Sequence, residues 1–119
     1  MMNEQKGTTA FAADDEGEDV YATPSALMEL SRLNQTNPNA ASVMLTLLSI
    51  MGSNGVVQTT QAKVAKHCNS TLQQVEKAIA DLAEEGWILS VDASSEPGGS
   101  LVCTVNPKLA RSEKPEELV

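Results

Sequence analysis

Apolar and polar positions follow a helical pattern most clearly between Thr59 and Trp87. In the second half of this stretch, apolar residues recur three and four positions apart, on one side of a helix: Val75, Ala78, Ile79 and Leu82. The first half predicts a shorter helix with a small and apolar face, formed by Ala62, Val64 and Ala65. Asn69 and Ser70 separate the two helices, because both side chains compete with the backbone for hydrogen bonds and favour turns. The stretch therefore predicts a helix, a three-residue turn and a longer helix.

Both ends of the longer helix carry sequence signals. At its start the sequence allows two alternative capping boxes, Ser70 with Gln73 or Thr71 with Gln74, and does not decide between them. Gly86 is expected to end the helix in the left-handed conformation, since glycine has no Cβ to clash there. A strand is expected to follow directly.

A β-hairpin is predicted after the longer helix. Residues 87–92 alternate, with Trp87, Leu89 and Val91 on one side and Ile88, Ser90 and Asp92 on the other. Residues 93–100 predict a loop, residues 101–105 the returning strand, and residues 56–58 a short strand that pairs with the hairpin. The expected fold class is mainly α with a small β-wing (α+β): a winged helix-turn-helix of three to four helices plus a β-hairpin.

Two further helices are predicted before this unit. Ser25 to Leu33 predicts a short helix with Ser25 as its N-cap and a leucine on one side at every third position: Leu27, Leu30 and Leu33. Asn37 is expected to cap the next helix, Asn39 to Met51, with Pro38 at its first position, where a missing N–H costs nothing.

The helix from Asn39 to Met51 is apolar on nearly every side, which is typical of a helix that is buried all round. A small domain does not easily surround one of its own helices. We therefore expect a homodimer formed through the first two helices, with an interface of Leu27, Leu30, Val43, Leu47 and Ile50. The alternative, a helix that is simply central in a small fold with Met residues filling gaps, stays open.

The chain has 119 residues, enough for one domain, and its net charge of −8 is unevenly spread. Residues 1–24 hold six acidic residues and one basic residue, residues 25–111 hold seven and six, and residues 112–119 hold three and one. We therefore expect a flexible acidic arm (1–24), a nearly neutral winged helix-turn-helix domain (25–111) and a charged C-terminal tail (112–119). The arm either solubilises the protein, docks a protein partner through residues 8–24, or masks the domain's own basic patch.

The expected cellular location of the protein, and whether it is an enzyme, are inferred mainly from sequence motifs that are absent. No apolar run approaches the length of a membrane span, the N-terminus lacks the pattern of a secretion signal, and the two cysteines have no motif spacing. We expect a cytoplasmic protein that has no membrane partner. No nucleophile with its base, paired carboxylate or phosphate-binding glycine loop is visible, and His67 beside Cys68 is too few ligands for a metal. Neither an enzyme nor a cofactor is expected.

Four segments carry a resemblance to a known family: NPNAASVMLTLLSIM, VVQTTQAKVAKH, TLQQVEKAIADLAEEGWI and the strand ending VNP. Together, from Asn37 to Asn106, they resemble the winged-helix domain of plasmid replication and copy-control regulators of the RepL type, and more distantly the MarR group. The resemblance implies a DNA-binding regulator on a mobile element or in its host. Together with the expected homodimer, this predicts a sequence-specific regulator of a plasmid, phage or other mobile element that binds double-stranded DNA.

The expected DNA contacts lie on the two helices of the helix-turn-helix: Thr60, Lys63, Lys66, Thr71, Gln73, Gln74 and Lys77. Glutamines can bond adenine at two points, and lysines bind phosphate. The sequence departs from similar domains, which carry arginines at the first outward positions, because Leu72 and Glu76 stand there and the loop of the hairpin has no base. An alternative therefore remains: a winged-helix module that docks a protein partner through its acidic arm or neutral helix face and does not bind DNA.

Overall fold

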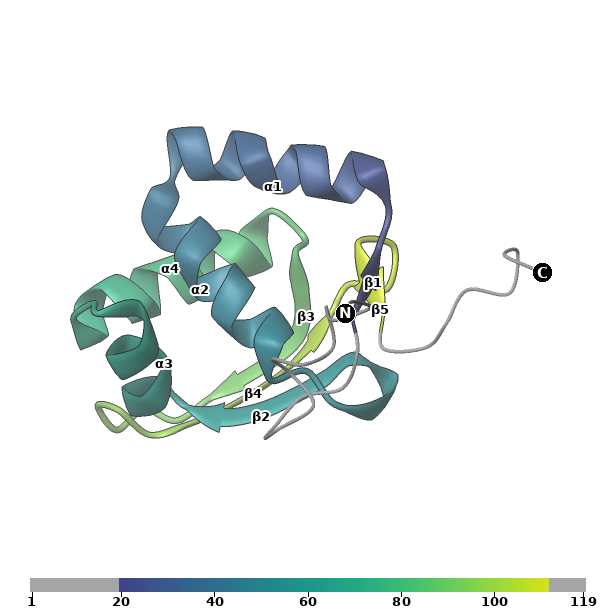
Figure 1. Cartoon of the computed structure of the whole chain (residues 1–119). Helices are drawn as coiled ribbons and strands as arrows, with labels where there is room; N and C mark the ends of the chain where they lie inside the picture. The colour runs from purple at the N-terminus through teal and green to yellow at the C-terminus, as the bar shows by residue number, and fades with distance from the viewer. Residues whose placement is uncertain (1–19, 112–119) are drawn as a thin grey trace, which may run out of the picture.

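The computed structural model describes residues 20–111 and combines four helices with a three-stranded antiparallel sheet, an α+β arrangement compatible with a winged helix (Figure 1). The helices are α1 (Pro24–Thr36), α2 (Pro38–Ser49), α3 (Gln61–Cys68) and α4 (Leu72–Glu84). The sheet has the order β2–β4–β3, formed by Val56–Thr60, Ser100–Val105 and Ile88–Ala93. A 3-10 turn, η4 (Ser53–Gly55), precedes β2. None of the helices within residues 20–111 is long and apolar enough to cross a membrane.

Helix α2 lies between α1 and α4, and the sheet covers the other side of the helical layer (Figure 1). As predicted, Asn37 caps α2: its side-chain oxygen accepts the Ala40 N–H at 3.2 Å, and Pro38 holds the first position. Helix α1 differs from the prediction at both ends. It begins at Pro24, because the Thr23 hydroxyl and not Ser25 accepts the Ala26 N–H, at 3.0 Å. It also runs past Leu33 to Thr36.

The core forms around α2 and contradicts part of the expected dimer interface. Val43 and Leu47 have no exposed surface within their own chain, so they are not available to a second subunit. The prediction assumed that a small domain cannot surround one of its helices, but α1, α3 and α4 together do so here. Leu27 is exposed, whereas Leu30 and Ile50 are partly buried against the core. Leu45 is a large apolar residue of α2 that is exposed, with an exposed fraction of 54%, and Ser42 and Ser49 are exposed as well.

The two helices and the three-residue turn between them form as the sequence indicated. Asn69 takes the left-handed conformation (φ 55°) after α3, and Thr71 then caps α4. The capping box that forms is Thr71 with Gln74. The predicted apolar stripe is buried along its whole length: Val75, Ala78, Ile79 and Leu82. Gly86 follows α4 with φ 82°, which confirms the left-handed end of the helix.

Strands β3 and β4 form the predicted hairpin, but the alternation in β3 does not continue. A bulge lies between Leu89 and Asp92, where Ser90 takes a φ of 53°. A bulge adds a residue to one strand and changes which face the following side chains occupy. Trp87, which precedes β3, and Ile88 are both buried, whereas Leu89 and Val91 are exposed.

A second, two-residue antiparallel pairing closes the described part of the chain. Strand β1 (Tyr21–Ala22) pairs with β5 (Ala110–Arg111). The last residues of the expected arm, from Tyr21 to Pro24, therefore belong to the folded part, and the boundary at residue 24 was placed too late. Residues 1–19 and 112–119 lie outside the described residues, so the acidic arm and the charged tail stay predictions.

Burial of α2 predicts the effect of shortening its side chains. Leu47→Ala should lower the free energy of unfolding by about 2–5 kcal/mol, because it removes buried methyl groups and leaves a cavity. The matched change Leu45→Ala, on the exposed side of the same helix, should cost no more than about 0.5 kcal/mol. Urea unfolding followed by circular dichroism measures both, and equal costs would contradict the placement of α2.

Candidate functional site

The expected DNA-contacting residues lie on α3, on the N-terminal half of α4 and at the junction of β2 with α3. Of the seven, Lys63, Lys66, Thr71, Gln73, Gln74 and Lys77 are exposed, and Thr60 is partly exposed. The structure therefore brings all seven to the surface of one helix pair. Their hydrogen bonds, however, divide them into two groups.

The start of α4 uses two of the expected residues for its own cap. The Gln74 N–H donates to the Thr71 hydroxyl at 3.1 Å, and the Thr71 N–H donates to Gln74 Oε1 at 2.9 Å. An amide whose oxygen is held in a capping box cannot offer both its donor and its acceptor to an adenine. Gln73 makes no side-chain hydrogen bond to any residue within 20–111, so it is the glutamine that remains available for a base.

Lys77 is held by a neighbour on its own helix. Its ammonium lies 3.3 Å from Asp81 Oδ2, and the same carboxylate accepts a hydrogen bond of 3.0 Å from Asn37 Nδ2. The Asn37 hydrogen bond, followed by the one from Lys77, lowers the pKa of Asp81 below its ordinary value of 3.8. Because the Lys77 side chain is largely exposed, water and salt screen the ion pair. The pair nevertheless reduces the positive charge that α4 presents.

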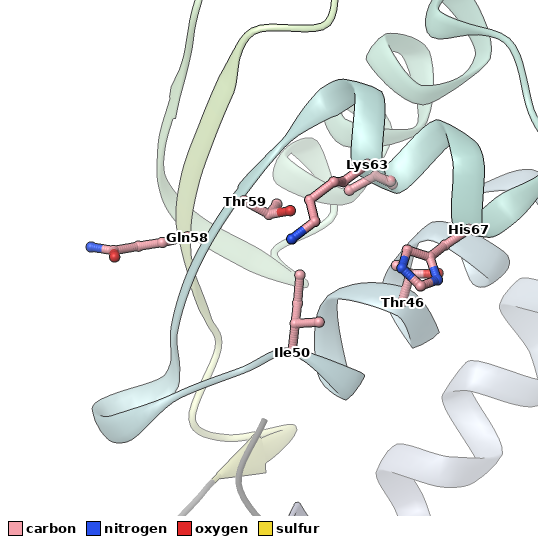
Figure 2. A pocket seen from close by; sticks show the side chains of 7 residues that line it. Thr46, Ile50, Gln58, Thr59, Lys63 and His67 are labelled. Atoms are coloured by element: carbon pink, nitrogen blue, oxygen red, sulfur yellow. The ribbon is translucent and has the colours of Figure 1, made fainter. Parts of the chain in front are cut away.

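Helix α3 carries two lysines that, unlike Lys77, form no ion pair with the described residues. The Thr60 hydroxyl accepts the Lys63 N–H at 3.1 Å and so serves as the N-cap of α3. The ammonium groups of Lys63 and Lys66 make no hydrogen bond or ion pair to the described residues. Lys63 borders a hollow of about 350 Å³ between α2, β2 and α3, with His67 one turn further along the helix (Figure 2).

The tip of the hairpin is attached to the start of α3, which the sequence did not indicate. The Gln61 N–H donates to the Gly99 carbonyl at 2.8 Å, and Gln61 Nε2 donates to the Ser94 carbonyl at 3.2 Å. Gln61 is only 2% exposed. Gly98 has φ 75°, and a Cβ there would lie 3.3 Å from that of Ala62. The loop and the helix therefore form one continuous surface.

Several acidic residues are exposed on α4 and on the hairpin. Glu76, Glu84 and Glu85 are exposed on or just after α4, and Glu96 is exposed on the loop of the hairpin. Thr60, Thr71, Gln74 and Lys77 have bonds within the chain, whereas Gln73, Lys63 and Lys66 are the expected residues left for a ligand. In residues 20–111, no three His, Cys, Asp or Glu side chains gather to hold a metal ion.

The link between Asn37 and Asp81 predicts a pH-dependent contribution to stability. A carboxyl group whose native-state pKa is lowered stabilises the fold in its charged form, and this contribution is lost as the pH falls through that pKa. Asp81→Asn should therefore lower the urea midpoint at neutral pH, and the difference from the unmodified protein should shrink below a pH of about 4. Asp92→Asn, on the exposed surface of β3, is the control. A difference that is constant with pH would contradict this role of Asp81.

Comparison with protein-family models, with curated proteins and with solved structures gave no match. A function for the chain is therefore inferred from its own residues and geometry, supported by the resemblance in its sequence.

Proposed function

We propose that the chain is a winged helix-turn-helix regulator that binds double-stranded DNA. One observation carries the proposal: α3, a three-residue turn and α4 are followed by a hairpin whose strands join β2 in the order β2–β4–β3. In winged-helix proteins the second helix of such a pair enters the major groove. The resemblance to RepL-type regulators supports this assignment and suggests a role in transcription, replication or copy control of a mobile element.

We assign different roles to the three available residues. Gln73, exposed at the start of α4, is in position to bond a base edge at two points. Lys63 and Lys66, exposed on α3, are suited to the phosphate backbone, which supplies much of the affinity of DNA-binding proteins. Two phosphate-binding lysines in one subunit give weak binding, so the proposal includes a dimer that doubles the contacts and spans two half-sites.

The proposed dimer now depends on α1, because the central residues of α2 are buried within the chain. Leu27 and Met28 are exposed on α1 with exposed fractions of 57% and 55%. A second subunit that covered these two side chains would remove their apolar surface from water. We place the contact between subunits at this end of α1.

A second candidate function is a module that docks a protein partner. The observation in its favour is the chemistry of α4: Glu76 is exposed on the helix, the Lys77 ammonium is paired with Asp81, and the Gln74 amide is held in the cap. Such a face is nearly neutral and repels phosphate at one position. Titration of the protein's own upstream DNA, at low and at physiological salt, distinguishes the two candidates, because a docking module would bind at neither salt concentration.

If Gln73 contacts a base directly, its replacement should reduce the selectivity of the protein for its preferred DNA site. Gln73→Ala should reduce discrimination between the preferred site and a mutated site by about 1–3 kcal/mol, because one two-point contact is lost. Lys66→Ala should instead weaken binding to all sequences and reduce the salt slope by about 0.9 for each lost phosphate contact. Fluorescence anisotropy at several salt concentrations measures both. Lys108→Ala, outside the helix pair, is the charge-matched control, and equal small effects from all three would argue against this surface.

Association through α1 predicts that one added charge yields a folded monomer. Leu27→Glu should shift the sedimentation coefficient from dimer to monomer at micromolar concentration, with an unchanged circular dichroism spectrum. Ser25→Glu adds the same charge on the other side of the first turn and should leave the dimer intact. A monomeric unmodified protein at high concentration would contradict the proposed interface.

A further inference from the structure

Gln61 is the one buried polar residue in the part of the chain that the structure describes. It is the first residue of α3, and its backbone and side-chain amides both donate to the hairpin loop, residues 94–99. An amide that is buried without a hydrogen bond costs free energy. The position of the hairpin loop is therefore coupled to the start of α3 through Gln61.

The hairpin loop also has hydrogen bonds of its own. The Ser94 hydroxyl accepts the Glu96 N–H at 3.1 Å, and the Glu96 carbonyl accepts the Gly99 N–H at 3.0 Å. The Ser94 N–H donates to the Ser100 carbonyl at 2.9 Å. A Cβ at Gly99 would lie 2.6 Å from the Ser94 hydroxyl oxygen, so a larger residue does not fit there. Once Gln61 holds the loop, these bonds determine where Glu96 lies.

Gly98 brings the hairpin loop against the first turn of both helices. A Cβ at Gly98 would lie 3.3 Å from the Ala62 Cβ and 3.8 Å from Leu72 Cδ1. Ala62 is the second residue of α3, and Leu72 is the first residue of α4. Figure 1 shows the turn between β3 and β4 at the end of the sheet where α3 begins. The loop therefore lies next to the first turn of α4, which also carries Gln73.

Glu96 places an unpaired carboxylate at this junction. It is exposed, and its side chain makes no hydrogen bond or ion pair to the residues that the structure describes. A carboxylate on a DNA-binding surface either repels phosphate or accepts a hydrogen bond from the amino group of a cytosine in the major groove. The first residues of the second helix are those that contact base edges in such proteins. A position beside that turn favours the contact with cytosine.

We propose that Gln61 is a positioning residue that holds the hairpin loop against α4, so that Glu96 contacts a cytosine beside the base bonded by Gln73. This inference depends on the proposed function and adds a determinant of sequence specificity to it. Gln61 is buried and does not itself touch DNA. The hairpin loop has no basic residue, so its contribution is to specificity and not to phosphate binding.

The contact is tested by selection of DNA duplexes from a random pool with the full-length protein, followed by sequencing. Sites bound by the unmodified protein should share an adenine and a nearby cytosine. Glu96→Gln should lower the preference for that cytosine by about fivefold or more, because one base contact is lost, and should leave the adenine preferred. Glu84→Gln removes the same charge near the other end of α4 and should leave both preferences unchanged.

The positioning role is tested with two variants that loosen the hairpin loop from opposite sides. Gln61→Ala removes the side-chain bond, and Gly98→Ala adds a Cβ against Ala62 where φ is 75°. Hydrogen exchange, measured without DNA, should become faster at the Ala62 and Gly99 amides and stay unchanged at the Val75 amide of α4. In the selection, both variants should lose the cytosine preference and keep the adenine preference. A change that only weakened the fold would reduce both preferences together.

Three results would overturn the inference. The first is a set of selected sites that share no cytosine, and the second is a Glu96→Gln variant that binds all sequences more tightly with unchanged preferences, as expected of a carboxylate that only repels phosphate. The third is a cytosine preference that survives when hydrogen exchange shows the loop to be loosened. If the unmodified protein selects no duplex, the proposed function itself is refuted, and the inference falls with it.

Discussion

Packing of α2 against α4 is the contact on which the rest of the structure depends. Both helices present small residues to each other, Ala40 and Ala41 on α2 and Ala78 on α4, and all three are buried. Small side chains let two helices approach closely, and larger neighbours such as Leu47 and Leu82 then fill the space on either side. The face of α4 that remains outside is thereby determined.

Polar contacts hold the same pair of helices in register. Asn37 Nδ2 donates to Asp81 near the end of α4, and Asn39 Nδ2 donates to the Gln74 carbonyl near its start, at 2.7 Å. The two bonds connect the first turn of α2 to both halves of α4. Rotation of α4 about its axis would break both bonds. The orientation of the proposed recognition helix is therefore built into the beginning of α2.

Sequence analysis predicted what is determined locally. Caps at Asn37 and Thr71, the turn at Asn69 and the left-handed Gly86 depend on a few neighbouring residues, and each appears in the structure. The ends of α1 are a local exception, since Thr23 and not Ser25 caps that helix. The other errors concern contacts between distant residues. Whether Leu47 packs against its own chain or against a second subunit depends on the positions of α1 and α4. The apolar pattern of α2 does not reveal those positions. The bulge in β3 and the docking of the hairpin loop on Gln61 are likewise products of tertiary packing.

The same holds for the candidate site: the sequence predicted its residue types, and the tertiary structure determines which of them are available. Sequence alone identified exposed lysines and glutamines on one helix pair, but not which of them the fold would occupy. The structure holds Gln74 in a cap and Lys77 in an ion pair, and it leaves Lys63 and Lys66 exposed on α3. Because the fold occupies Gln74 and Lys77, the proposed DNA contact depends on Gln73, Lys63 and Lys66, and residue type alone did not separate these three from the others.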